Sequence, residues 1–169
     1  MTSTDGTCWY FGYGSNMSPQ TFVERRGMQP LETRIARLEG WSLCFDLPVG
    51  PGERAVANLQ PDPDTHTWGV VYRLSAADCE RLDRSEGVPQ GVYDRLEVQI
   101  CCTGEPAALA AFTYQSRHRR DGRKPSARYL GIMLDGARHH GLPAEWVAYL
   151  ERFELAVDER EPVTKGPSS

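Results

Sequence analysis

The chain has 169 residues, of which 40% are apolar and 25% charged, and its formal net charge is −4. This size and composition predict one soluble globular domain, which buries roughly 70% of its unfolded surface and needs no metal or disulfide to fold. The acidic balance argues against nucleic acid as a partner. No apolar run approaches the ~18 residues of a membrane span, and residues 1–7 lack the features of a signal peptide, so we expect a cytoplasmic protein.

A run of seven residues begins within the first predicted strand, 8–13, and ends as a tight, glycine-containing loop. Its sequence is Tyr10-Phe11-Gly12-Tyr13-Gly14-Ser15-Asn16. Two glycines this close allow positive φ angles or a close approach to a ligand. Ser18, Pro19 and Gly27 are a typical N-cap, first helical residue and stop, and they predict a short helix over 19–26. A loop before a helix can direct backbone N–H groups at a carboxylate or an oxyanion, and an ordinary turn is the alternative.

The loop does not match the known nucleotide-binding motifs. A dinucleotide fingerprint would require a third glycine where Met17 stands. A P-loop would require a following Gly-Lys-Ser/Thr, which is absent from this sequence.

The rest of the chain mixes strand and helix signals. Further strands are predicted at 33–38, 40–47, 54–60, 67–74, 92–102 and 107–115, with proline-rich loops at 48–52 and 61–64. Helices are predicted at 76–85 after Ser75, at 127–140 after Ser126 with Gly141 as the stop, and at 144–153. Because the order is not a regular βαβ alternation, we predict a small α+β domain with a mixed, barrel-like β-sheet core and helices packed outside. The domain is expected to span 8–157, with disordered tails at 1–7 and 158–169.

The five cysteines do not resemble a metal site. They are Cys8, Cys44, Cys79, Cys101 and Cys102, an odd number without CxxC spacing, and we predict that all are reduced and act as small apolar residues. The histidine pair 139–140 lies at a predicted helix end, where it complements the helix dipole. A basic stretch, 117–124, is predicted to be a solvated loop that could attract an anionic substrate at the mouth of a site.

One carboxylate stands out by its position. Glu86 lies at the C-terminal end of the predicted helix 76–85, beside Gly87. The negative end of the helix dipole disfavours a carboxylate there by up to about 1 kcal/mol and raises its pKa. A raised pKa suits a general base near neutral pH, although a solvated glutamate at a frayed helix end is the simpler alternative.

These motifs together resemble the γ-glutamylcyclotransferase family. The similarity covers roughly residues 9–154, with several short motifs in the family's order. They are Tyr13-Gly14-Ser15-Asn16, Trp68-Gly69-Val70-Val71, Leu82-Asp83-Arg84-Ser85-Glu86-Gly87-Val88 with Tyr93, Pro125-Ser126 with Tyr129, Gly136-Ala137, and Gly141-Leu142-Pro143.

The resemblance implies a β-barrel fold with a cavity at its mouth and assigns roles to residues. Glu86 matches the catalytic glutamate, and Tyr93 and Tyr129 match tyrosines of the substrate pocket. The loop that binds the γ-glutamyl group matches Tyr10, Phe11, Gly12, Tyr13, Gly14, Ser15 and Asn16. A glutathione-specific branch usually carries leucine in place of Asn16, so the asparagine points to the broader dipeptide branch.

The implied reaction closes a γ-glutamyl amide into 5-oxoproline through its own α-amine. The partner is a small γ-glutamyl substrate, and no metal, cofactor or enzyme nucleophile is required. An amide hydrolase, a γ-glutamyl-removing enzyme of a biosynthetic pathway and a non-catalytic ligand-binding module are the alternatives. The natural leaving group is left open, as is a homodimer.

Overall fold

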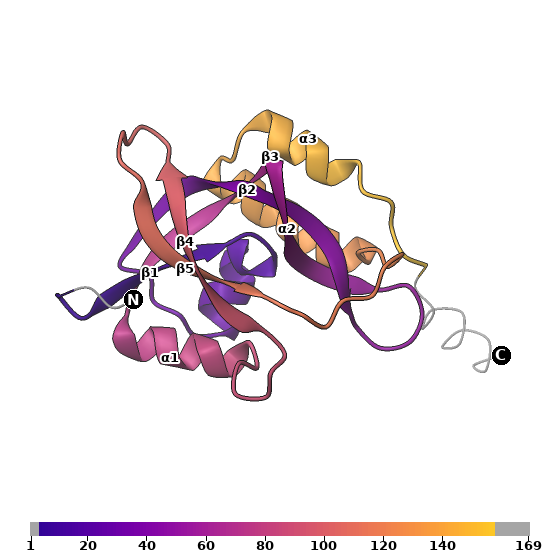
Figure 1. The fold of residues 1–169 in the computed structure, drawn as a ribbon, viewed down its shortest axis with the longest axis horizontal. Coiled ribbons are helices and arrows are strands. Elements are labelled where there is room, and N and C mark those ends of the chain that lie inside the picture. The colour runs from indigo at the N-terminus through magenta and orange to yellow at the C-terminus, as the bar shows by residue number, and fades with distance from the viewer. Residues whose placement is uncertain (1–3, 158–169) are drawn as a thin grey trace.

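The computed structural model describes residues 4–157, which form a barrel with helices around it (Figure 1). The strands are β1 (Thr7–Gly12), β2 (Glu32–Pro48), β3 (Ala55–Ser75), β4 (Asp94–Cys102) and β5 (Leu109–Gln115). The helices are η1 (Ser15–Met17), η2 (Gln20–Arg25), α1 (Ala76–Ser85), α2 (Ala127–His140) and α3 (Ala144–Glu151). Of the predicted tails at 1–7 and 158–169, residues 1–3 and 158–169 lie outside the described residues. Thr7, placed in the N-terminal tail by that prediction, already begins β1.

The five strands close in the order β1-β3-β2-β4-β5. Four of the strand pairs are antiparallel, and a parallel contact between Tyr10 and Phe112 joins β5 back to β1. In Figure 1, α1 lies at the lower edge of the molecule and α3 at the upper edge, with the barrel between them. The predicted α+β class, the barrel and the outer helices are therefore confirmed.

The strands β2 and β3 are longer than predicted, because each joins two predicted strands. In β2, Gly40 has a φ of 84° and lies where the pairing with β3 is irregular, between the two strands predicted at 33–38 and 40–47. In β3, the predicted loop at 61–64 is wrong, since Pro61 pairs with Trp41 and His66 pairs with Glu39. A single residue of β2 thus faces four residues of β3, a bulge that bends the ribbon without ending it.

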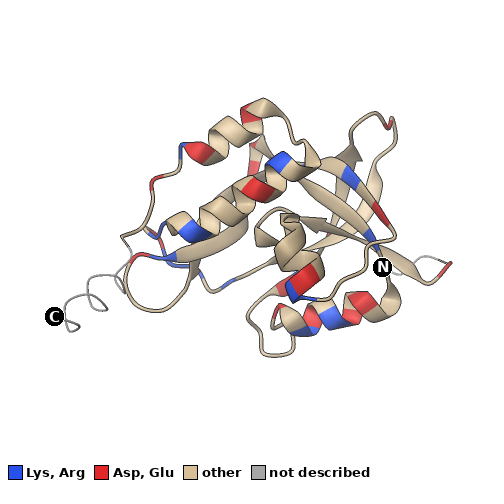
Figure 2. Cartoon of the chain, turned by 180° about the vertical axis from the view of Figure 1, so that it is seen from behind, with Lys and Arg blue, Asp and Glu red and all other residues tan. Residues whose placement is uncertain are grey.

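The four predicted helices are present, three of them as α-helices. Ser75 and Ser126 accept the predicted N-cap hydrogen bonds from Asp78 and Tyr129, at 3.1 Å and 3.0 Å. The short helix predicted over 19–26 is present as a π-helix over Gln20–Arg25. Charged residues of both signs spread over the outer faces of the helices, which face solvent (Figure 2).

A disulfide joins Cys8 of β1 to Cys79 of α1, so the prediction that all five cysteines are reduced is wrong for this pair. The two residues are 71 positions apart, and only the packing of α1 beside the start of β1 brings them together. Cys44, Cys101 and Cys102 are free thiols.

The packing of the core places the loop at 13–16. Tyr10, Phe22 and Tyr72 stack on one another, with 4.2 Å between the ring centroids of Phe22 and Tyr72. At Gly136 of α2, an added Cβ would lie 2.5 Å from the carbonyl carbon of Met17. Because no larger residue fits there, α2 packs directly on η1 and supports the loop from outside.

Candidate active site

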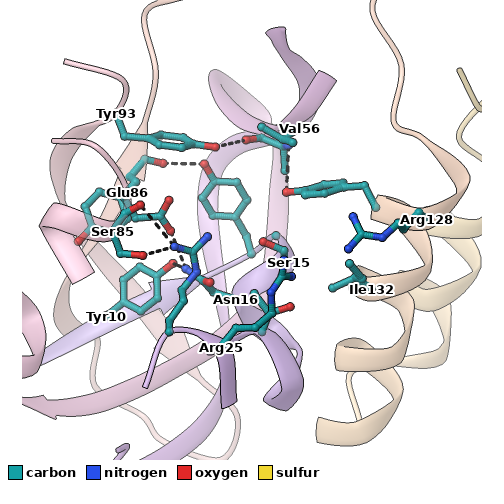
Figure 3. A pocket seen from close by; sticks show the side chains of 17 residues that line it. Tyr10, Ser15, Asn16, Arg25, Val56, Ser85, Glu86, Tyr93, Arg128 and Ile132 are labelled. Atoms are coloured by element: carbon teal, nitrogen blue, oxygen red, sulfur yellow. Dashed lines mark hydrogen bonds between the residues drawn. The ribbon is translucent and has the colours of Figure 1, made fainter. Parts of the chain in front are cut away.

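A cavity of about 570 Å³ lies between the loop at 13–16, the end of α1, the strand β3 and the start of α2 (Figure 3). Such a volume is typical of a small-molecule site. The lining residues are Tyr10, Tyr13, Gly14, Ser15, Asn16, Thr21, Arg25, Arg26, Val56, Ala57, Ser85, Glu86, Tyr93, Tyr114, Arg128, Tyr129 and Ile132.

The end of α1 places Glu86 in this cavity. Its backbone N–H completes the last turn by donating to the carbonyl of Leu82 at 2.8 Å. Gly87 then takes a φ of 72°, a conformation that glycine adopts without strain, and the chain turns away. The carboxylate of Glu86 is held by Asn16, whose Nδ2 donates to Oε1 at 2.7 Å.

Burial raises the pKa of Glu86 above its ordinary value. The nearby charge of Arg26 and the hydrogen bond from Asn16 act in the opposite direction without cancelling this effect. The side chain is only half-buried, because the cavity leaves it in contact with solvent. Such a carboxylate can accept a proton from a ligand in the cavity.

Asn16 connects the loop to the barrel as well as to Glu86. Its side-chain Nδ2 also donates to the hydroxyl of Tyr10 at 2.9 Å, and its backbone carbonyl accepts from the hydroxyl of Tyr72 at 2.7 Å. Its Oδ1 is buried and has no hydrogen-bond partner among residues 4–157. These contacts give the amide one orientation relative to the carboxylate.

Two tyrosines approach Ala57 of β3 from different elements. Tyr93 donates its hydroxyl to the Ala57 carbonyl at 3.1 Å, and the hydroxyl of Tyr129 accepts from the Ala57 N–H at 3.2 Å. Burial raises the pKa of both phenols, so they are neutral at physiological pH. At Gly14, an added Cβ would lie 2.9 Å from the Tyr129 hydroxyl, so the absence of a side chain lets the tyrosine reach the loop.

Two of the predicted substrate-binding residues do not line the cavity. Phe11 is fully buried in the core, and an ideal Cβ at Gly12 would lie 3.3 Å from the Tyr10 ring. Successive side chains of a strand point to opposite faces, so Tyr10 faces the cavity and Phe11 faces away from it. The substrate contact predicted for Phe11 and Gly12 does not agree with these positions, which serve packing.

Other residues line the cavity without having been predicted from the sequence. They are Thr21, Arg25, Arg26, Val56, Ala57, Ser85, Tyr114, Arg128 and Ile132. Ser85 directly precedes Glu86 in the sequence, and Arg128 directly precedes Tyr129. Their positions next to predicted site residues could therefore have indicated that these two residues also line the cavity. No residue of the predicted basic loop, 117–124, lines this cavity, and within the loop Arg119 pairs with Asp46 and Lys124 with Glu53.

Comparisons with known proteins place the chain in a family. The profile of the AIG2-like family matches residues 66–150. γ-Glutamylcyclotransferase of Bos taurus is 30% identical over 159 residues, which cover 91% of this chain and 83% of the bovine protein. The chain belongs to the γ-glutamylcyclotransferase family.

Further members support this placement. The γ-glutamyl cyclotransferase gliK of Claviceps purpurea is 33% identical over 143 residues, covering 77% of this chain and 63% of that protein. A solved structure titled γ-glutamyl cyclotransferase has the same fold, with a TM-score of 0.77 and 24% identity over 95% of this chain and 99% of the other. The resemblance inferred from the motifs is confirmed, and the family is one of enzymes.

Two other features are absent from the part of the chain that the structure describes. Within 4–157, no group of three or more His, Cys, Asp or Glu side chains is arranged to hold a metal ion. No helix in this range is long and apolar enough to cross a membrane.

Proposed function

We propose that the protein converts a γ-glutamyl amino acid or amine into 5-oxoproline and the free amino acid or amine. The observation that carries this proposal is the half-buried carboxylate of Glu86, held by Asn16 at the cavity wall in a chain of this family. The remaining parts of the cavity fit the needs of such a reaction.

The reaction begins with a proton transfer. Glu86 removes a proton from the α-ammonium of the substrate, and the freed amine attacks the γ-carbonyl carbon of the same molecule. The C–N bond that forms closes a five-membered ring, and the carbonyl electrons move to oxygen. When the carbonyl re-forms, the bond to the leaving nitrogen breaks, and that nitrogen takes up the proton held by Glu86. The ring nitrogen still carries one proton too many after its attack, and it gives this proton to the carboxylate of Glu86, which passes it to the released amine or to water.

The cavity contributes by holding the substrate folded. An amine held against a carbonyl reacts without the entropy cost of a bimolecular encounter, a benefit of up to roughly 7–11 kcal/mol in well-oriented systems. The backbone N–H groups around Gly14 and Ser15 are the donors that we assign to the oxyanion, and one such donor contributes about 3–4 kcal/mol in known enzymes. The neutral hydroxyls of Tyr93 and Tyr129 contact Ala57 of β3, which forms the wall beside this loop.

The decisive test uses the α-amine of the substrate. γ-Glutamyl-alanine and its N-acetylated form are incubated with the enzyme, and 5-oxoproline, glutamate and alanine are measured by mass spectrometry. We expect 5-oxoproline and alanine from the free compound and no cleavage of the acetylated one, because acetylation removes the nucleophile and leaves the γ-amide intact. Comparable cleavage of both compounds would replace cyclisation with hydrolysis by water. A cytoplasmic location and a homodimer stay predictions.

A further inference from the structure

Three arginines line the cavity, and their surroundings differ. Arg26 donates to the hydroxyl and the carbonyl of Ser85, and its charge lowers the pKa of Glu86. Arg25 and Arg128 are exposed, and neither guanidinium group forms a hydrogen bond or an ion pair with any residue in the range 4–157. Two free guanidinium groups therefore stand at the mouth of the site.

These free arginines come from separate elements. Arg25 ends η2, and Arg128 is the second residue of α2. In Figure 3, Arg128 extends from α2 toward the cavity on the side away from Glu86, and Ser15 lies between the two. The cavity thus has the carboxylate of Glu86, with Arg26 near it, at one side and the guanidinium of Arg128 at the other.

Folding does not account for Arg128. The first turn of an α-helix disfavours a cation by about 0.3–1 kcal/mol, because the positive end of the helix dipole lies there. Ser126 already caps this turn through the N–H of Tyr129. A side chain that is exposed, unpaired and placed against the dipole points to an anion brought by a ligand.

We propose that Arg25 and Arg128 bind the carboxylate of the leaving amino acid and thereby determine the specificity for this group. This inference rests on the proposed function and names residues that recognise the leaving group. When the α-amine of the substrate lies at Glu86, the amide bond runs across the cavity and the leaving group extends toward the side of Arg128. A planar guanidinium matches a carboxylate through two parallel hydrogen bonds, and an uncharged amine offers nothing in return.

The substrate carries a second carboxylate, on the α-carbon of the glutamyl unit, so the experiment must separate the two. γ-Glutamyl-alanine and γ-glutamyl-ethylamine do this, because ethylamine is alanine without its carboxylate. Both compounds keep the glutamyl unit unchanged. A contact with the leaving carboxylate affects only the first compound, whereas a contact with the α-carboxylate affects both.

The measurement is kcat/KM for 5-oxoproline release from each compound by the wild type, R25Q, R128Q and the double variant. For γ-glutamyl-alanine we expect a fall of roughly tenfold per single substitution, the lower end of the range for a charge-assisted contact, because both arginines are exposed. For γ-glutamyl-ethylamine the values should stay within about twofold. The preference of the wild type for the alanine compound should weaken as ionic strength rises.

Arg120, exposed and outside the cavity, supplies the matched control R120Q, which removes the same charge without changing the preference.

A charge-reversed variant guards against a merely structural effect. R128E should reverse the selectivity, disfavouring γ-glutamyl-alanine and favouring mono-γ-glutamyl-ethylenediamine, whose leaving group carries an ammonium. Equal losses with the alanine and ethylamine compounds would overturn the inference and assign the arginines to the α-carboxylate. Unchanged values for both would also overturn it. A wild type that releases 5-oxoproline from neither compound would refute the proposed function itself, a result distinct from either of these.

Discussion

Asn16 Nδ2 lies 2.7 Å from Glu86 Oε1, and this contact joins the loop before η1 to the end of α1 across 70 residues of sequence. The amide also donates to the Tyr10 hydroxyl, so its position is determined from two sides. A hydrogen bond donated to a carboxylate favours the ionised form. Asn16 thereby opposes the effect of burial on the pKa of Glu86 and holds the carboxylate in place.

Replacement of Asn16 by leucine should move the acid limb of the pH profile. Without the amide donor, the pKa of Glu86 rises further, so the base becomes ionised only at higher pH. We expect the acid limb of kcat/KM to shift upward by about one pH unit, with a lower plateau. In Tyr10→Phe the contact between Asn16 and Glu86 remains, and the limb should stay in place. A limb that is unmoved or displaced to lower pH in Asn16→Leu would contradict this role.

Glu86→Gln should abolish turnover and leave the fold intact. The amide keeps the shape of the carboxylate and cannot accept the proton, so we expect a loss of about 10²–10⁴ in kcat. Activity within tenfold of the wild type would refute the assignment of the base.

The same variant makes a prediction about stability. Because the pKa of Glu86 is higher in the folded than in the unfolded state, its protonated form stabilises the fold. This stabilisation is complete below the ordinary glutamate pKa and is lost as the pH rises through the folded-state pKa. Glu86→Gln should therefore equal or exceed the wild type in melting temperature at pH 8, and the difference should shrink in acid.

Local signals predicted the parts of the fold that depend on neighbouring residues. The serines at 75 and 126 and the glycine at 141 act within one helical turn, and all three helix ends were predicted correctly. The position of Glu86 followed from the same local reasoning. By contrast, proline and aspartate at 61–64 usually mark a loop, and this segment continues the strand because Pro61 at its start and His66 just beyond its end pair with β2.

Tertiary packing decided the features that the sequence could not show. Nothing in the sequence relates Cys8 to Cys79, since the contact depends on where α1 packs. Alternation along β1 separates Tyr10 from Phe11, although both belong to one motif. Arg25 and Arg128 carry no local pattern that distinguishes them from other surface arginines.

Gly14→Ala should reduce activity without unfolding the protein. The new methyl would lie 2.9 Å from the Tyr129 hydroxyl and 3.3 Å from the Ala57 Cβ, so the tyrosine must move away from the loop. We expect a loss of about tenfold or more in kcat/KM, because small displacements at a reacting centre are costly. Gly131→Ala on α2, where an added Cβ meets no atom within 4 Å, is the control and should keep full activity. Equal activity in the two variants would show that Tyr129 need not contact the loop.

Asp83→Asn should affect stability more than catalysis. Asp83 accepts from the Tyr114 hydroxyl at 2.5 Å and from Arg95 at 3.0 Å, which ties α1 to the barrel near Glu86. We expect a lower melting temperature and a loss in kcat well below that of Glu86→Gln, because the carboxylate supports the site from outside the cavity lining. If Asp83→Asn abolished turnover and Glu86→Gln did not, the base would have been misassigned.

The disulfide can be checked by counting thiols. Denatured, unreduced protein should show three reactive thiols, from Cys44, Cys101 and Cys102, and prior reduction should raise the number to five. A cross-link that closes a loop of 71 residues is expected to stabilise the fold by about 4 kcal/mol in the chain-entropy account. Cys8→Ser should therefore lower the melting temperature, whereas Cys101→Ser, at an exposed free thiol, should leave it unchanged. Both variants should keep their turnover once folded, because the proposed reaction uses no thiol. Five reactive thiols in unreduced protein would show that Cys8 and Cys79 are not joined in solution.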